Sequence, residues 1–211
     1  MGRTWLLPPY GLRRPRNGTV FPCPILVSEK NLSMQRVMII GCGGTGKSTL
    51  ARHMGAITGL PVIHLDQHYW QPGWVSLDKA SWEKRVRELM DKPRWIMDGN
   101  YGGTMDLRME QSDTIIFLDR SRWICLYRVV RRTLGNLGRT RPDLAPNCPE
   151  RFTWEFLTYI YRYNRTRRPG ILRKLKTMND HKKIYHLLSD REMQQFLDGL
   201  GERGDNTSSP L

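Results

Sequence analysis

The sequence predicts an α/β domain built around a parallel sheet, and three observations support this fold class. Short apolar segments alternate with amphipathic ones from Arg36 onward, which is the pattern of a parallel sheet covered on both faces. Residues 41–48 match the spacing G-x-x-x-x-G-K-[ST] between an apolar run and a helix-forming run. Three apolar runs end directly at an aspartate, namely Asp66, Asp98 and Asp119. A chain of 211 residues with 39% hydrophobic residues is long enough for one such domain.

The first strand is predicted at residues 37–40, immediately before the glycine-rich loop. The helix after the loop continues to about Thr58, because Gly59 can close a helix and Pro61 prevents its continuation. The apolar residues 62–65 then predict a second strand.

Helical spacing of apolar residues predicts a second helix at about residues 78–91, and Pro93 ends this segment before a third strand at 95–97. Residues 114–118 are the most β-like run of the chain and predict a fourth strand. A fifth strand is predicted at 184–188.

A last helix is predicted at residues 189–200, followed by a flexible tail at 201–211. Residues 1–33 are rich in Pro, Gly and Arg and have no period, so we interpret them as a leader that is disordered or not native to the fold. The domain itself is predicted to span 34–200. Between the fourth and fifth strands we expect two or three helices and an irregular segment at about 135–150, which is a candidate lid.

The glycine-rich loop has the composition of a phosphate cradle. Backbone N–H groups at the start of a helix bind anionic phosphate, and glycines let the backbone wrap closely around it. Lys47 is predicted to reach the β- and γ-phosphates of ATP, and Ser48 to hold Mg²⁺. A glycine-rich turn that binds nothing is the alternative, but the order of strand, loop and helix favours the cradle. The predicted nucleotide contacts here are Gly41, Gly43, Gly44, Thr45, Gly46, Lys47, Ser48 and Thr49.

Asp66 and Asp98 are predicted at the carboxyl edge of the sheet, where open α/β sheets bind ligands. One carboxylate near the loop can hold the water shell of Mg²⁺, and another can orient or deprotonate an attacking hydroxyl. The alternative is that each aspartate only caps the turn that follows it. Asp119 is expected to cap the helix that contains Arg128.

Residues 67–74 form an aromatic and polar stretch where a strand-to-helix loop is expected. Their indole and phenol rings could contact a base or sugar, or could simply pack against the edge of the sheet. His64 and His68 lack partners at zinc-ligand spacing, so metal binding by them is not expected. Residues 98–103 could grip the acceptor substrate or form only a turn.

The formal net charge of +14 is concentrated in one region. Residues 120–176 contain 15 Lys and Arg against three acidic residues, a net charge of +12, and Arg outnumbers Lys there by 13 to two. The planar fork of arginine matches phosphate, so some of these residues are expected to contact phosphate. Arg128 and Arg132 share one helix face, and Arg139 and Arg141 lie in the candidate lid. The remaining arginines are expected to form a solvated face, with nucleic acid as a weakly supported partner.

The composition also excludes several classes of protein. No apolar run approaches the roughly 20 residues that a transmembrane helix needs, and Pro8 and Pro9 interrupt the only apolar run near the N-terminus, so we expect a cytoplasmic protein that does not bind membranes. The four cysteines form no C-x-x-C pair and are expected to be reduced.

These motifs together resemble the adenylate-kinase-related P-loop proteins known as DNA topology modulation proteins. The likeness covers about residues 34–200. Besides the phosphate loop it involves residues 65–74, 98–101, 116–119 and 139–143. The resemblance implies a P-loop NTPase fold like that of nucleoside-monophosphate kinases, with a five-stranded parallel sheet of order 2-3-1-4-5, a helical lid insertion, and ATP and Mg²⁺ at the loop.

The resemblance also implies individual roles. Asp98 with Gly99 is similar to the Asp-Gly of nucleotide kinases, where the aspartate supports Mg²⁺. Arg128 resembles an arginine that stacks on adenine, and Arg132 one that contacts phosphates. Nucleotide kinases follow Asp-Gly with Phe-Pro-Arg, whereas Asn100 follows here, so the usual arginine for a monophosphate acceptor is absent. Asp66 looks more like the carboxylate that faces the acceptor hydroxyl in small P-loop kinases.

The predicted function is ATP- and Mg²⁺-dependent transfer of the γ-phosphoryl group to a nucleotide, nucleoside or other small hydroxylated acceptor. The alternative is an ATP-regulated DNA-binding protein that affects DNA topology. A plain ATPase or GTPase switch is a weaker alternative because no N-K-x-D string appears. Ser48 and Asp98 are expected at the metal. The expected catalytic side chains are Lys47, Asp66, Asp98, Arg132, Arg139 and Arg141.

Overall fold

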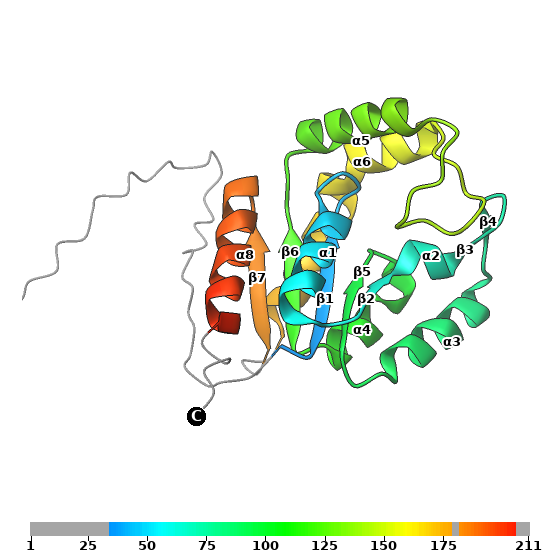
Figure 1. Ribbon diagram of the computed structural model, residues 1–211. Coiled ribbons are helices and arrows are strands. Elements are labelled where there is room, and N and C mark those ends of the chain that lie inside the picture. The colour runs from blue at the N-terminus through cyan, green and yellow to red at the C-terminus, as the bar shows by residue number, and fades with distance from the viewer. Residues whose placement is uncertain (1–33, 179–181, 206–211) are drawn as a thin grey trace, which may run out of the picture. The chain divides into compact units, whose positions relative to one another are not determined.

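Five parallel strands form the central sheet of the described part of the computed structural model, in the order β2-β5-β1-β6-β7 (Figure 1). Counted along the chain, this is the predicted order 2-3-1-4-5. The strands are β1 (Arg36–Gly41), β2 (Val62–His64), β5 (Trp95–Asp98), β6 (Thr114–Leu118) and β7 (Lys183–Leu187). The structure describes residues 34–178 and 182–205, so the predicted leader and the end of the predicted tail lie outside the described residues.

Helices cover both faces of this sheet. On one face α1 and α8 pack side by side, in front of the strands in Figure 1. Helices α3, α4, α6 and α7 contribute to the core on the other face, and α5 packs against α6. The helices are α1 (Lys47–Thr58), α2 (Leu65–Tyr69), α3 (Lys79–Met90), η1 (Gly102–Thr104), α4 (Met105–Gln111), α5 (Arg122–Asn136), α6 (Trp154–Thr166), α7 (Arg168–Lys176) and α8 (Asp190–Asp205).

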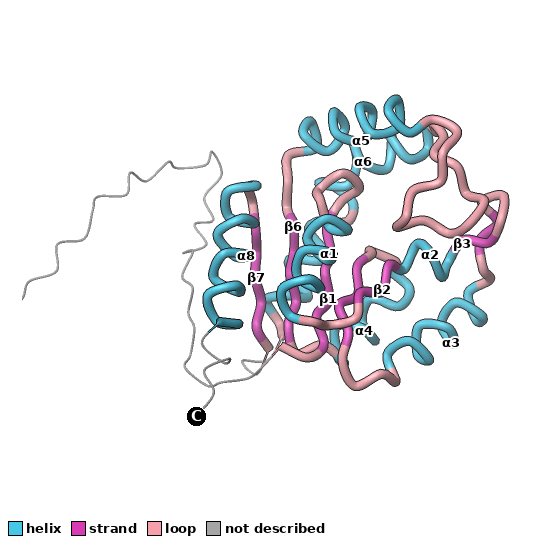
Figure 2. The backbone as a smooth tube through the Cα atoms, viewed as in Figure 1, coloured by secondary structure: helices cyan, strands magenta, loops and turns pink. Residues whose placement is uncertain are grey.

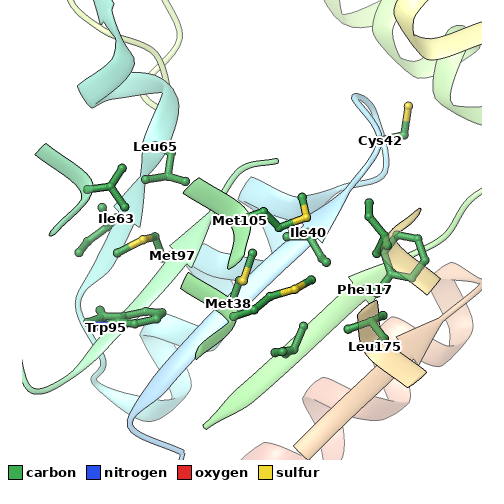
Figure 3. Close-up of a cluster of buried hydrophobic side chains, with 14 of the residues drawn as sticks. Met38, Ile40, Cys42, Ile63, Leu65, Trp95, Met97, Met105, Phe117 and Leu175 are labelled. Atoms are coloured by element: carbon green, nitrogen blue, oxygen red, sulfur yellow. The ribbon is translucent and has the colours of Figure 1, made fainter. Parts of the chain in front are cut away.

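The core follows from the two-residue period of β1. Val37 and Ile39 point to the face covered by α1 and α8, whereas Met38 and Ile40 point to the opposite face. All four side chains are fully buried, and Figure 3 shows Met38 and Ile40 among the buried residues of their cluster. Burial of each such side chain stabilises the fold by about 1.5–3 kcal/mol. This packing fixes β1 at the centre of the sheet, where its carboxyl end carries the glycine-rich loop.

Local signals end and start the helices as predicted. Gly59 follows α1 with φ of 67°, a left-handed conformation that glycine adopts without a Cβ clash, and its N–H donates to Gly55 O at 2.9 Å. Asp78 precedes α3, and its side chain accepts hydrogen bonds from Ala80 N and Ser81 N, both at 3.0 Å. The predicted helices at 47–58 and 78–91 are therefore confirmed.

Several elements differ from the prediction. Leu65 starts α2, so the second strand ends at His64 and Asp66 lies on a short helix. A two-stranded antiparallel hairpin, β3 (Trp70–Gln71) with β4 (Val75–Ser76), occupies the aromatic stretch. Helix α8 continues to Asp205, so the first residues of the predicted tail are helical. Short hairpins of this kind are set by tertiary contacts, which local periodicity does not show.

Within residues 34–178 and 182–205, no helix has the length and apolar composition that crossing a bilayer requires.

Candidate active site

The loop between β1 and α1 has the geometry of a phosphate cradle. Its backbone turns through glycines with positive φ, 80° at Gly44 and 99° at Gly46. A Cβ on Gly44 would lie 2.5 Å from Cys125 O, so only glycine lets the loop approach α5 this closely. The Lys47 ammonium donates to Cys42 O at 2.9 Å and lies at the N-terminus of the 12-residue helix α1. Backbone N–H groups, helix dipole and ammonium therefore converge on one point.

Ser48, Asp98 and His64 form a hydrogen-bonded chain beside this loop. Ser48 Oγ donates to Asp98 Oδ2 at 2.8 Å, and His64 Nδ1 donates to Asp98 Oδ1 at 2.5 Å. Burial of the imidazole lowers the pKa of His64, but the hydrogen bond to Asp98 and its negative charge outweigh this and raise the pKa overall. His64 thus fixes the carboxylate while one oxygen stays with Ser48.

Asp66 lies on α2 and pairs with Tyr101 from the loop after β5. The Tyr101 hydroxyl donates to Asp66 Oδ1. Burial raises the pKa of Asp66 and the negative charge of Asp98 adds to this, while the Tyr101 hydrogen bond opposes it. A carboxylate whose pKa is raised accepts a proton more readily, which suits it to act on an acceptor hydroxyl.

The loop after β5 is held by a buried arginine that sequence reasoning missed. Arg108 donates to Gly99 O at 2.9 Å, to Asn100 O at 2.5 Å and to Tyr101 O at 3.1 Å. Burial lowers the pKa of Arg108 to about 9. Asn100 in turn accepts a hydrogen bond from Gly41 N at 3.0 Å, which ties this loop to the phosphate cradle. The only sequence signal that Arg108 holds this loop is its position, about one helical turn into the segment that follows the polar loop after Asp98.

Three of the arginines predicted at the site, Arg128, Arg132 and Arg141, pair with a carboxylate. Arg128 pairs with Asp190, which also lies 3.1 Å from Arg120. Arg132 Nε donates to Glu150 Oε1 at 3.0 Å. In the loop between α5 and α6, which we call the lid (residues 137–153), Arg141 Nε donates to Glu150 Oε2 at 2.8 Å and its Nη1 donates to Asp143 at 2.9 Å. Glu150, the common partner of Arg132 and Arg141, could not be identified from the sequence.

The lid contacts the hairpin formed by β3 and β4, and Figure 2 shows it reaching toward that hairpin. Three hydrogen bonds join the two segments: Gly73 N donates to Asn147 O at 3.1 Å, Cys148 Sγ to Gln71 O at 3.2 Å and Trp74 Nε1 to Pro149 O at 3.0 Å. A fourth joins the lid to α2, where Gln67 Nε2 donates to Pro142 O at 2.5 Å. The guanidinium of Arg151 also lies over the Trp74 ring, 5.0 Å from its centroid. The loop that contains most of the segment predicted as a lid, 135–150, therefore lies against the aromatic stretch.

These elements line a cavity of about 1210 Å³. Trp70 and Trp74 line it, whereas Tyr69 packs against Trp82 and Tyr101 in the core, so the aromatic stretch is divided between the cavity wall and the core. The predicted site residues that line the cavity are Gly43, Gly44, Gly46, Lys47, Ser48, Thr49, Asp66, Asp98, Arg128, Arg132 and Arg141.

Three predicted site residues do not line this cavity. Gly41 lies behind the loop, and a Cβ there would meet Leu118 O at 2.4 Å. Thr45 is fully buried, and its hydroxyl donates to Cys42 O at 2.8 Å, so its side chain shapes the loop. Arg139 is exposed. Its backbone carbonyl accepts a hydrogen bond from Glu150 N at 2.9 Å. In this closed lid the Arg139 side chain does not reach the phosphate cradle.

The expectation for Asp119 was wrong. Asp119 does not cap α5, whose preceding residue is Ser121. Its carboxylate instead accepts from Arg168 Nε at 2.8 and 2.9 Å and lies 2.9 Å from His186 Nε2. Burial raises the pKa of Asp119, but these two partners outweigh burial and lower it. Arg168, expected on a solvated face, is therefore part of a structural ion pair.

The site fits a magnesium-bound nucleoside triphosphate. The loop glycines leave a backbone-lined hollow, and a Cβ on Gly46 would have only Met193 Sδ near it, at 3.9 Å. Ser48 and Asp98 offer the hydroxyl and carboxylate oxygens that Mg²⁺ prefers. No group of three or more His, Cys, Asp and Glu side chains able to hold a metal occurs in the described ranges.

Comparisons with known proteins bear on the fold. No protein-family model and no curated protein matches the chain. Among solved structures, the chain is similar to a shikimate kinase from Acinetobacter baumannii in complex with shikimate, with a TM-score of 0.51, 13% identity, and coverage of 84% of this chain and 97% of that chain. The chain is also similar to a shikimate kinase from Bacteroides thetaiotaomicron, with a TM-score of 0.48, 16% identity, and coverage of 82% of this chain and 99% of that chain. A sugar kinase from Janibacter sp. has a TM-score of 0.43 and 17% identity, with coverage of 82% of this chain and 94% of that chain.

Sheet order, loop geometry and the first of these similarities define the class of fold. The chain has a P-loop NTPase fold of the kind found in small-molecule kinases. At such low identity the similarity concerns the fold alone. Membership of the DNA topology modulation family stays a prediction.

Proposed function

We propose that the protein is an ATP- and Mg²⁺-dependent phosphotransferase whose acceptor is a nucleotide, a nucleoside or another small hydroxylated molecule. One observation carries the proposal: Lys47, Ser48, Asp98 and Asp66 line the same cavity, opposite the arginines of α5 and the lid. A phosphate cradle alone serves any nucleotide-binding protein. A second carboxylate beside it, with room for another molecule, is what transfer to an acceptor requires.

Each side chain has a role in this proposal. Lys47 and the loop N–H groups hold the phosphates, while Ser48 and Asp98 hold Mg²⁺, which when bound neutralises charge on the phosphate oxygens. Asp66 takes the proton from the acceptor hydroxyl as its oxygen forms a bond to the γ-phosphorus. The bond from that phosphorus to the bridging oxygen breaks, and ADP leaves with the electron pair. Arg132 and Arg141 stabilise the charge that spreads over the group in transfer.

The lid and hairpin explain how water is kept from the reaction. Three hydrogen bonds join the lid to the hairpin and a fourth joins it to α2, on the side of the cavity that Trp74 lines. A closed lid excludes water that would otherwise accept the phosphoryl group. The hairpin also places Trp70 on the acceptor side, where its ring offers an apolar surface to the acceptor.

ADP release measured with a panel of nucleoside monophosphates, nucleosides and sugars tests this proposal. We expect one class of compound to raise ADP release well above that with water, and Lys47→Ala to abolish the rise while the protein stays folded. Lys84→Ala, a lysine on α3 away from the cavity, is the matched control. If no compound raises ADP release, or if Lys47→Ala behaves like the parent, the proposed function is wrong.

A second candidate function, ATP-regulated binding of nucleic acid, is favoured by one surface. Trp123, Tyr127 and Trp154 on α5 and α6 are 65%, 64% and 73% exposed. Arg122 lies over the rings of Trp123 and Tyr161, at 5.9 and 5.1 Å. Exposed rings among arginines suit stacked bases and phosphates. Binding of an oligonucleotide that weakens steeply with salt and changes with ATP would favour this candidate, and no binding at low salt would remove it.

A further inference from the structure

Glu150 is the most enclosed carboxylate of the lid, and only 5% of the residue is exposed. Its Oε1 accepts from Arg132 Nε and from Thr133 Oγ1, both at 3.0 Å, and its Oε2 accepts from Arg141 Nε at 2.8 Å. One carboxylate therefore holds an arginine of α5 with one oxygen and an arginine of the lid with the other.

Glu150 holds each arginine by one edge of its guanidinium. That edge decides which N–H groups of the arginine remain available to a ligand. Both donate through Nε, the inner edge of the guanidinium. Among the described residues, the terminal Nη groups of Arg132 have no hydrogen-bond partner, and of Arg141 only Nη1 has one, Asp143. Because a guanidinium is planar, fixing its Nε edge fixes the direction in which the Nη groups point. Both residues line the cavity that contains Lys47.

Glu150 also joins the two ends of the lid through its backbone. Its N–H donates to Arg139 O at 2.9 Å, and its carbonyl accepts from Gly138 N at 3.2 Å. The carboxylate and the closure of the lid are therefore parts of one local structure. Without the carboxylate the two arginines would also repel each other: burial lowers the pKa of Arg132, and the charge of Arg141 lowers it further.

We infer that Glu150 is a positioning residue for phosphoryl transfer, holding Arg132 and Arg141 by their Nε edges so that their Nη groups face the phosphoryl group in the closed lid. The inference rests on the proposed function and adds to it. It assigns a role to a residue that does not itself contact the reacting atoms.

Glu150 could act through its negative charge or by positioning the two arginines. The two roles predict different effects of removing its carboxylate, and this difference makes the inference testable. Removing a negative charge near bound phosphates should, by charge alone, tighten the binding of ATP. Loss of arginine positioning should slow the transfer step instead, because a displacement of about 1 Å at a reacting group slows it by about 100-fold. The experiment therefore measures affinity and turnover separately.

The test uses the full chain, Mg·ATP, calorimetry for the dissociation constant, and single-turnover ADP formation with the compound from the acceptor panel that raises ADP release most. For Glu150→Gln we expect turnover about 100-fold below the parent with unchanged or tighter ATP binding. Glu150→Asp keeps the charge but shortens the side chain, so we expect turnover about tenfold below the parent, whereas a role of charge alone predicts parental turnover. Glu150→Asp also serves as the test if Glu150→Gln does not fold.

Thr133→Val is the matched control. It removes one hydrogen bond to Glu150 but leaves both arginine contacts, so its turnover should stay within about threefold of the parent. The inference is overturned if Glu150→Asp retains parental turnover, or if affinity and turnover fall together in both Glu150 variants. A parent that binds no ATP would instead overturn the proposed function, and with it the inference.

Discussion

Ser48 and Asp98 are 50 residues apart in the sequence, yet Ser48 Oγ donates to Asp98 Oδ2 at 2.8 Å. The sheet produces this pairing, since β1 and β5 are neighbours with Ile39 in register with Asp98. The loop carries Ser48 from the end of β1 to the start of α1, above the end of β5. A hydroxyl and a carboxylate are thereby fixed at one edge, before any ligand binds.

Asp98→Asn should weaken the dependence of activity on Mg²⁺ by removing the charged member of this pair. We expect the Mg²⁺ concentration for half-maximal ADP formation to rise about 10- to 100-fold. A magnesium titration at fixed ATP measures it, with Asp91→Asn on the exposed end of α3 as the control. An unchanged titration curve would mean that Asp98 does not support the metal.

Asp66→Asn should stop acceptor-dependent turnover while stabilising the protein. A general base contributes about 100-fold or more to the rate. Because the pKa of Asp66 is raised in the folded protein, folding disfavours its ionised form relative to the unfolded chain, so a neutral amide at this position should raise Tm. In the parent, turnover should fall as pH falls through that raised pKa. Loss of both activity and stability in Asp66→Asn would contradict this role.

His64 should make stability depend on pH. Its pKa is raised above the ordinary 6.5 by Asp98, so its stabilising ion pair is complete below pH 6.5 and is lost as pH rises through the raised value. Urea unfolding of the parent should show a loss of roughly 1–2 kcal/mol across this range, and NMR titration of His64 should give the same midpoint. The loss should be absent from His64→Gln. A His64 midpoint below 6.5 would refute the ion pair.

Trp74→Phe should loosen the lid. The change removes the hydrogen bond to Pro149 O but keeps a ring beneath Arg151. One such bond contributes about 1 kcal/mol, so backbone hydrogen exchange across residues 142–149 should become about fivefold faster. Trp154→Phe, which alters an exposed ring on α6, is the control. Equal exchange in the two variants would show that Trp74 does not hold the lid.

The sequence predicted the parts of the site that depend on local patterns. The cradle and the five strands follow from short-range spacing and apolar periodicity, and the structure has all of them. Asp66 and Asp98 were found because parallel strands bring their carboxyl ends to one edge.

The partners of these residues could not be predicted, since they come from distant parts of the chain. Tyr101 reaches Asp66 across 35 residues, and Arg168 reaches Asp119 across 49. Asp119 looked like a helix cap because only its neighbours in the sequence were visible. Glu150 likewise carried no local signal, since a lone acidic residue in a basic segment reads as ordinary surface charge.

Calorimetric titration of the full chain with Mg·ATP tests whether the loop from Gly41 to Ser48 holds a magnesium-bound nucleotide. We expect saturable heat with one site per chain in the parent and a large loss of affinity in Lys47→Ala, which removes the ammonium at the N-terminus of α1. No heat from folded parent protein at millimolar Mg·ATP, or equal binding by Lys47→Ala, would contradict it.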